Sequence, residues 1–420
     1  MSDKGKKSDT MLDKIRNTIW VRARLRKLPV VRDWIFKRNI NSIKSNYPAE
    51  LKNSEVFRRE RELLALTSLK AVQRTEGKNV LFINNSILRC GIHQYGVNVA
   101  EILMKSKKFN FMYAECDFFN EIERQVLLLK PDIIIVNIVT LEEFAQMLSG
   151  LRRFRDAILI ALHHEPAFIS NVIKIMDIFD AHLIADPTMR KENPYSLIGL
   201  PRLIPSYDTN KNLSSEVVIG SFGFAGRHKG FEKLIRVVQE EFDAAVIRIN
   251  MPASDYVGGG KSIYAINYAK ELSAIVKKKN IRLEISTEFL THEGILEFLS
   301  ANTLNAFLYD DLGYRGVSSV IDYALAVRRP ICITKSAMFR HIYDTEPSIC
   351  LEETTLQEVI KNGIKPLEKF YEIWSEDAFL SRFEQILEEV LEKKNSKNLT
   401  CKNYASASLK IKRRNLSLAS

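Results

Sequence analysis

Short apolar runs alternate with longer amphipathic stretches along the chain from about residue 78. Polar residues bound each short run, as in buried strands, whereas the longer stretches repeat their apolar residues at helical spacing. This alternation predicts parallel βαβ units. The predicted strands fall into two sets: residues 79–83, 111–114, 132–138, 157–162 and 181–185, then residues 217–222, 245–249, 281–285, 304–309 and 330–334.

Each set suffices for one doubly wound sheet. The predicted fold class is therefore α/β, with two Rossmann-like parallel-sheet domains that face a cleft. Two prolines and a polar stretch separate the sets and predict a linker, because such residues favour exposed turns. We expect an N-terminal domain at residues 77–205, a linker at 206–215 and a C-terminal domain at 216–375.

The first 76 residues predict a basic helical extension. Apolar residues recur near helical spacing between positions 11 and 31, interleaved with Lys and Arg. A basic amphipathic helix can lie on an anionic membrane surface, where each cation contributes on the order of 1 kcal/mol. The alternative is a helix that packs on the body of the protein or on a protein partner, with its cations solvated.

The net charge of +11 is unevenly distributed. Residues 1–76 carry 19 Lys and Arg against 9 Asp and Glu, and residues 391–420 carry 8 against 1, so the region between them is mildly acidic. A nucleic-acid groove needs clustered cations on the folded body, so this pattern argues against nucleic-acid binding. The basic tail at 395–420 has little apolar periodicity and is predicted to be disordered.

Several classes of protein are disfavoured by simple features of the sequence. No apolar run reaches the roughly 18 residues that span a bilayer, and the start lacks the apolar stretch of a secretory signal. We expect a cytoplasmic protein, peripheral at the inner face of the cell membrane if its basic arm binds lipid. The five cysteines are widely spaced and include no C-x-x-C pair, so they indicate neither a zinc site nor a disulfide framework.

The most informative stretch is residues 217–234, VVIGSFGFAGRHKGFEKL, in which an apolar strand leads through a glycine-containing turn into an amphipathic helix. Glycines allow close backbone approach to an anion, and a helix N-terminus offers unpaired N–H groups. With the cations Arg227 and Lys229, the turn predicts a pyrophosphate site at the carboxyl end of a strand. The alternative is an ordinary tight turn with two solvated cations.

This stretch resembles the start of the donor-binding domain in retaining GT-B glycosyltransferases, the large glycosyltransferase group 1, or family 4. Their pattern G-R-x-x-x-x-K-G uses its Arg and Lys to hold the donor diphosphate. Gly223, Lys229 and Gly230 match the pattern, but Phe224 stands at the Arg position. Arg227 is the candidate substitute.

Residues 313–336, GYRGVSSVIDYALAVRRPICITKS, resemble the segment E-G-F-G-x-x-x-L-E-A-x-A-x-G-x-P-V-I-x-S of the same family. The resemblance implies that Asp322 bonds the donor ribose and that Tyr314 replaces the Glu associated with the donor sugar. Anchoring on the proline instead shifts this pair to Tyr323 and Arg315. Read without the family, Asp322 is a solvated helix residue.

Backbone amides near the start of the helix in this segment are expected to cap the donor phosphates. The residues concerned are Gly316, Val317 and Ser318.

Two loops of the N-terminal domain resemble the family's opposing face of the cleft. Gly91, in the turn that follows the first strand, matches the glycine-rich loop that faces the donor phosphates, although Cys90 replaces a common Gly and a structural turn is the alternative. The fourth strand ends at His163, His164 and Glu165, where many members carry a His followed by an acid. The resemblance implies that His164, or alternatively His163, lies near the donor sugar and acceptor.

The resemblance implies transfer of a sugar from a nucleoside-diphosphate donor to an acceptor, with retention. The basic arm suggests that the acceptor is a glycan or lipid-linked precursor at the membrane. His164, Arg227 and Lys229 are the expected catalytic residues. Catalysis by cations and dipoles requires neither a metal nor a cofactor. The alternatives are a non-catalytic nucleotide-sugar-binding or scaffold protein, suggested by Phe224 and Tyr314, and more remotely a nucleotide-sugar epimerase. The segment 376–394 is expected to cross back onto the N-terminal domain, as the last helices of GT-B enzymes do.

Overall fold

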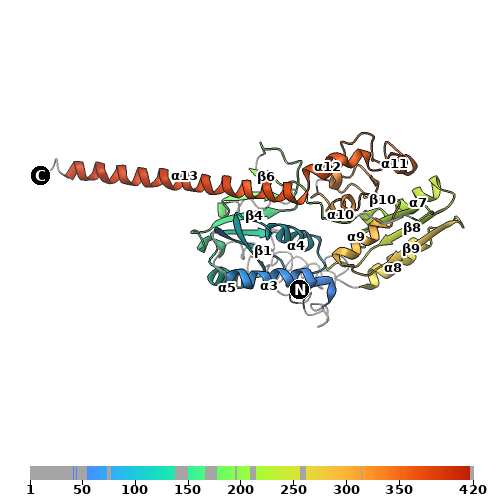
Figure 1. The fold of residues 1–420 in the computed structure, drawn as a ribbon, viewed down its shortest axis with the longest axis horizontal. Helices are drawn as coiled ribbons and strands as arrows, with labels where there is room; N and C mark the ends of the chain where they lie inside the picture. Colours follow the sequence, from blue (N-terminus) through green and yellow to red (C-terminus); the bar gives the residue numbers. More distant parts are fainter. Residues whose placement is uncertain are drawn as a thin grey trace, which may run out of the picture.

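The computed structural model describes residues 41, 44, 54–72, 77–137, 150–165, 177–193, 196–208, 214–255, 262–313 and 315–416, with side chains through residue 396. Within these residues the strands form two separate parallel sheets (Figure 1). The first has the order β2-β1-β3-β4-β5-β6 and the second the order β11-β10-β7-β8-β9. The N-terminal arm over residues 1–40 and Tyr314 lie outside the described residues.

All ten predicted strands are present, and the α/β prediction with two parallel sheets is confirmed. The strands are β1 Lys78–Asn84, β2 Phe109–Glu115, β3 Ile133–Asn137, β4 Ile158–His163, β5 Ala181–Ile184, β6 Leu197–Gly199, β7 Val218–Phe222, β8 Ala245–Asn250, β9 Ile281–Ser286, β10 Leu304–Phe307 and β11 Ile331–Ile333. The sequence missed β6 because this edge strand has three residues, of which only the first is fully buried.

The central strands are buried on both faces, which is why they appear in the sequence as continuous apolar runs. Every residue of β3 and of β4 is buried. The two strands pair in parallel, with Ile135 opposite Ile160 and Asn137 opposite Leu162. Parallel pairing brings the carboxyl ends of the strands, and the loops that follow them, to one edge of each sheet.

Helices cover both faces of each sheet. On the first sheet, α3, α4 and α13 pack on one face and α5 on the other. On the second, α7, α8 and α11 face α9, α10 and α12 across the strands. The helices are α3 Arg58–Val72, α4 Gly91–Leu103, α5 Phe119–Leu129, α7 Phe231–Glu241, α8 Ser262–Ser273, α9 His292–Ser300, α10 Val320–Ala326, α11 Leu356–Asn362, α12 Glu368–Ile373 and α13 Glu376–Leu416, with 3-10 turns η2 Glu55–Phe57, η3 Leu151–Arg153, η5 Arg227–Lys229, η7 Ala337–Ile342 and η8 Lys365–Leu367.

The last helix, α13, returns from the C-terminal domain to the N-terminal one (Figure 1). Phe379 and Phe383 of its first turns are fully buried in the core of the first sheet, where the Phe383 ring lies 6.4 Å from that of Phe111. The Lys394 ammonium donates to the carbonyl oxygen of Ala157 at 2.8 Å. The final helix is therefore a structural part of the first domain.

The structure differs from the prediction that residues 395–420 are disordered, since α13 continues as a helix to Leu416. The segment 395–416 contains no Gly or Pro. Extending an established helix adds one backbone hydrogen bond per residue fixed, so a polar segment continues a helix that it could not nucleate.

Part of the N-terminal extension is built into the fold. Helix α3 packs on β2, where the Thr67 hydroxyl accepts a hydrogen bond from the backbone N–H of Tyr113 at 2.7 Å. Its Glu60 is buried beside His93. Within the part of the chain that the structure describes, no helix is both long and apolar enough to cross a membrane.

Candidate functional site

A cavity of about 470 Å³ lies between the two domains, at the carboxyl ends of their strands. Loops that follow β1, β4, β7, β8 and β9 line it, together with the segment that leads into α10. The cavity brings together most of the predicted site residues: Gly91 and His164 from the N-terminal domain, and Gly223, Lys229, Gly316, Val317 and Ser318 from the C-terminal domain. Arg227 and Asp322 are not among its lining residues.

Lys229 ends the short turn η5 between β7 and α7. The next residue, Gly230, has φ 68°, and a Cβ there would lie 1.9 Å from the carbonyl oxygen of Leu308, so only glycine fits. The Lys229 ammonium lies 4.1 Å from the centroid of the Tyr309 ring. Among the described residues it forms no ion pair with a carboxylate. The turn therefore directs a positive charge without an acidic partner into the cavity.

Burial lowers the pKa of Lys229 to about 7, because an ammonium loses hydration inside the protein. The nearby Arg315 lowers this pKa further, while the carboxylate of Glu165 acts in the opposite direction. These effects show that Lys229 shares an electrostatic environment with both residues. An anion in the cavity would favour its charged form.

Arg227 does not take the place of the missing family arginine in this structure. Its guanidinium is exposed, lies 2.6 Å from the carboxylate of Glu271 and stacks on Tyr268 with 5.0 Å to the ring centroid. Phe224 does line the cavity, where its ring stacks on Phe289 at 6.2 Å. The wall at the family's arginine position is thus aromatic.

A different arginine of the C-terminal domain, Arg315, lines the cavity. The Arg315 guanidinium donates to both carboxylate oxygens of Glu165, from Nε at 3.0 Å and from Nη2 at 2.9 Å. The backbone N–H of Gly316 donates to the same carboxylate at 2.8 Å. A Cβ on Gly316 would lie 2.0 Å from the carbonyl oxygen of His164, so the two loops touch through this glycine.

His164 lines the cavity as a neutral imidazole. Burial lowers its pKa to about 3, with a smaller contribution from Arg202. Its Nε2 lies 2.6 Å from the side-chain oxygen of Asn137, and its ring packs edge-on against Tyr95. The Asn137 amide group donates to Asn84 and to the backbone of Ile92, so its oxygen faces the histidine. His164 therefore carries its proton on Nε2, which leaves Nδ1 as an acceptor.

His163 points elsewhere. Its Nε2 lies 3.1 Å from Nδ1 of His182, and burial lowers its pKa to about 3. It does not line the cavity. Of the two adjacent histidines, His164 is the one that the structure brings to the cleft. Asn137 orients His164, and it was not identified as a site residue from the sequence. The available signal was its place as a polar residue at the end of a buried apolar strand.

Asp322 is buried and forms an ion pair with Arg202, whose Nε donates to Oδ1 at 2.9 Å and whose Nη2 bonds the other oxygen. Arg202 also donates to the carbonyl oxygen of Ala185 at 2.6 Å. This placement differs from the predicted ribose role, because both carboxylate oxygens are occupied away from the cavity surface. No sequence pattern marked Arg202, which lies 120 residues from its partner.

The residues of the alternative register do reach the cavity. Tyr323 and Arg315 both line it. The hydroxyl of Tyr323 accepts a hydrogen bond from Asn98 at 3.2 Å and lies 3.1 Å from Nδ1 of His292. Both residues of the register anchored on Pro330 therefore reach the cavity, whereas Asp322 of the other register does not.

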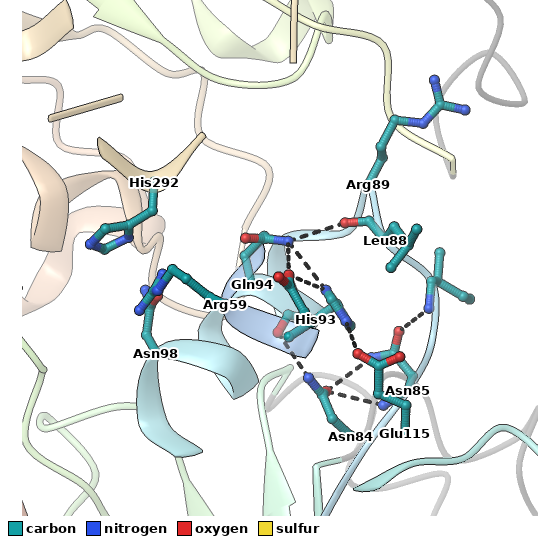
Figure 2. A network of polar contacts seen from close by, with 12 residues as sticks. Arg59, Asn84, Asn85, Leu88, Arg89, His93, Gln94, Asn98, Glu115 and His292 are labelled. Atoms are coloured by element: carbon teal, nitrogen blue, oxygen red, sulfur yellow. Dashed lines mark hydrogen bonds and ion pairs between the residues drawn. The ribbon is translucent and has the colours of Figure 1, made fainter. Parts of the chain in front are cut away.

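Figure 2 shows how the loop near Gly91 is held in place. Arg89 lines the cavity and pairs with Asp255 of the other domain, with Nε 3.0 Å from Oδ1. His93, in contrast, is fully buried below the loop, where its Nε2 lies 3.1 Å from Glu115 and its Nδ1 lies 3.2 Å from Gln94 (Figure 2). We therefore assign His93 to the support of the loop.

The lining residues suit an anion better than a metal ion. Within the described ranges, no group of three or more His, Cys, Asp or Glu side chains could hold a metal. Cys90, which lines the cavity, is a free thiol, and burial raises its pKa to about 11. The cations Arg89, Arg202, Lys229 and Arg315 all line the cavity, against one lining carboxylate, Glu165.

Comparison with known proteins gives no match to a protein-family model and no match among curated proteins. Solved structures do match. A glycosyltransferase from Rickettsia africae has 9% identity and a TM-score of 0.53, covering 76% of this chain and 99% of its own. HepE of Anabaena in complex with UDP has 11% identity and a TM-score of 0.52, covering 74% and 100%.

A UDP-forming α,α-trehalose-phosphate synthase from Burkholderia xenovorans, in complex with glucose-6-phosphate, also matches. It has 9% identity and a TM-score of 0.52, covering 75% of this chain and 100% of its own. These likenesses show that the chain has the GT-B fold, which the sequence resemblance implied.

The Asp322–Arg202 pair gives a prediction about stability. Replacing Asp322 with Ala leaves a buried guanidinium unpaired and should lower the free energy of unfolding by about 3–5 kcal/mol. Replacing exposed Asp243 with Ala is the control and should change stability little. Urea denaturation of both variants measures the difference. An Asp322→Ala protein as stable as the unmodified chain would contradict the buried-pair interpretation.

Proposed function

We propose that this chain, with its GT-B fold, transfers a sugar from a nucleoside-diphosphate donor to an acceptor, with retention and without a metal ion or cofactor. The fold and the cavity between the domains support the proposal. HepE was solved with UDP, and the trehalose-phosphate synthase is UDP-forming, so uridine donors are the first to test. Retention and metal independence rest on the family resemblance.

The observation that carries the proposal is the ammonium of Lys229. It lies at the carboxyl end of β7, in the turn that the sequence marked as an anion site, without a carboxylate partner among the described residues. Retaining an unpaired, partly desolvated charge costs free energy, which a bound anion would offset. A donor diphosphate supplies such an anion.

The chemistry we propose is mainly electrostatic. When the bond between the anomeric carbon and the diphosphate breaks, negative charge grows on the leaving group, and Lys229 would stabilise it. The donor would lie against Gly91, Gly223, Gly316, Val317 and Ser318, which line the cavity.

His164, neutral and with a free acceptor at Nδ1, would face the sugar. Its fixed position would help to align donor and acceptor, which converts a bimolecular step into one between neighbours. Arg227 and Asp322 have no part in this proposal, since other residues of the chain engage them.

We further propose that the acceptor is a glycan or lipid-linked glycan precursor at an anionic membrane surface, which the basic arm would bind. The support is the excess of Lys and Arg over residues 1–76. Co-sedimentation with vesicles tests this: anionic vesicles should bring down the full chain, and a chain lacking residues 1–40 should remain in solution. Equal binding of both chains would contradict it.

Donor turnover tests the proposed reaction. A panel of nucleotide sugars scored by thermal shift should identify the donor, because a ligand of the folded state raises apparent stability. With an acceptor extract, the chain should release nucleoside diphosphate and glycosylate a product. Lys229→Ala should lower this rate by about a hundredfold or more, whereas Arg227→Ala should retain it because Arg227 lies outside the cavity.

Full turnover by Lys229→Ala would contradict the assignment of Lys229. The same assay separates the alternative functions, since an epimerase gives an isomeric sugar and a scaffold protein consumes no donor. The observation that favours a binding protein is Phe224, an aromatic residue at the position where the family has an arginine.

Donor binding should depend on pH. The pKa of Lys229 is about 7 in the free protein, and a bound diphosphate favours its charged form, so binding above pH 7 takes up a proton. Donor affinity should therefore fall between pH 7 and 9, by up to about tenfold per pH unit. Lys229→Arg stays protonated and should give a flatter profile. Calorimetry measures both, and an unmodified chain with constant affinity would contradict the role of Lys229.

A further inference from the structure

We infer that Arg315 is the second phosphate-binding cation of the cleft, and that Glu165 occupies its guanidinium until a diphosphate displaces the carboxylate. This inference rests on the proposed function and extends it to residues for which the family pattern gives no phosphate role. The exchange takes place where the loop after β4 touches the segment that precedes α10.

The contacts of Glu165 have the geometry of an anion site. Its carboxylate accepts two hydrogen bonds from the edge of the Arg315 guanidinium and one from the backbone N–H of Gly316, all between 2.8 and 3.0 Å. A phosphate group accepts the same bidentate pair and the same backbone hydrogen bond, and it carries more charge. Gly316 permits the close approach, since any side chain would collide with the neighbouring loop.

The charge balance of the cavity points to Arg315 as the cation that is free to change partners. Arg202 is held by Asp322, whose side chain is 4% exposed, and Arg89 by Asp255, whose side chain is 1% exposed. The Arg315–Glu165 pair is different, with side chains 39% and 19% exposed. Since both of its members are more exposed than the buried carboxylates Asp322 and Asp255, exchanging this pair does not leave a fully buried charge without a partner.

Lys229 and Arg315 act on the same volume. Both side chains line the cavity, and Arg315 lowers the pKa of Lys229 while Glu165 raises it. When Glu165 leaves, both positive charges face the cavity, and no other carboxylate is among its described lining residues. Two cations match the charge of the diphosphate in a nucleotide sugar.

Arg315 also supplies what the turn after β7 lacks. Phe224 stands at the arginine position of the family pattern, and Arg227 is engaged by Glu271 outside the cavity. The second cation therefore comes from the segment that leads into α10. Because Glu165 belongs to the N-terminal domain, donor binding would replace a direct contact between the domains with one through the ligand.

Calorimetric titration with inorganic pyrophosphate and with UDP tests the inference on the full chain. Glu165→Gln removes the competing charge and should tighten pyrophosphate binding by about threefold to fivefold, the range of a partly exposed ion pair. Arg315→Gln removes a charged hydrogen-bond donor and should weaken binding by about tenfold to a hundredfold. Arg315→Lys keeps the charge without the bidentate geometry, so its affinity for pyrophosphate should lie between those of the unmodified chain and Arg315→Gln. Arg227→Gln is the matched control and should bind as the unmodified chain does.

Thermal melting of each variant first establishes that it is folded. An Arg315→Gln protein that binds pyrophosphate like the unmodified chain would overturn the inference and leave the proposed transfer intact. Weaker pyrophosphate binding by Glu165→Gln would overturn the inference that the diphosphate displaces Glu165. Binding that depends on Arg315 in a chain without donor turnover would support the inference and refute the transfer reaction.

Discussion

A positive charge without a carboxylate partner, held between two domains, is the constraint around which the site is organised. The Lys229 ammonium is partly desolvated, and this is unfavourable unless something in the fold or a ligand compensates. The aromatic face of Tyr309 provides part of the compensation, since cations are attracted to aromatic rings. Glu165 provides part at longer range. The remainder is available to an anionic ligand.

The fold could be predicted from the sequence because buried parallel strands appear as continuous apolar runs, and these runs are local. All ten predicted strands formed, and only the short edge strand β6 was missed. Local signals also indicated the turn that holds Lys229, since Gly230 adopts a conformation that only glycine fits. Strands and tight turns can be predicted in this way because they depend mainly on residues that are adjacent in the sequence.

The direction of a charged side chain depends instead on partners far along the chain. Arg227 pairs with a residue 44 positions away, and Asp322 with one 120 positions away, so neither pairing had a local signal. Arg315 entered the sequence analysis only through an alternative alignment. Its position became clear when the fold brought the loop of Glu165 beside it. The motifs thus indicated where the cleft lies. The long-range ion pairs hold Arg227 and Asp322 outside its lining and Arg315 within it.

The return of α13 to the first domain has a consequence for how the chain folds during synthesis. Phe379 and Phe383 complete a core whose other members are made much earlier, most of them before residue 204. At typical rates of translation, on the order of ten seconds or more pass before those phenylalanines are added. During this interval the face of the first sheet that α3 and α4 cover still lacks α13, while the second domain is already being made. The nascent first domain therefore presents part of its apolar surface to chaperones until the start of α13 has been made.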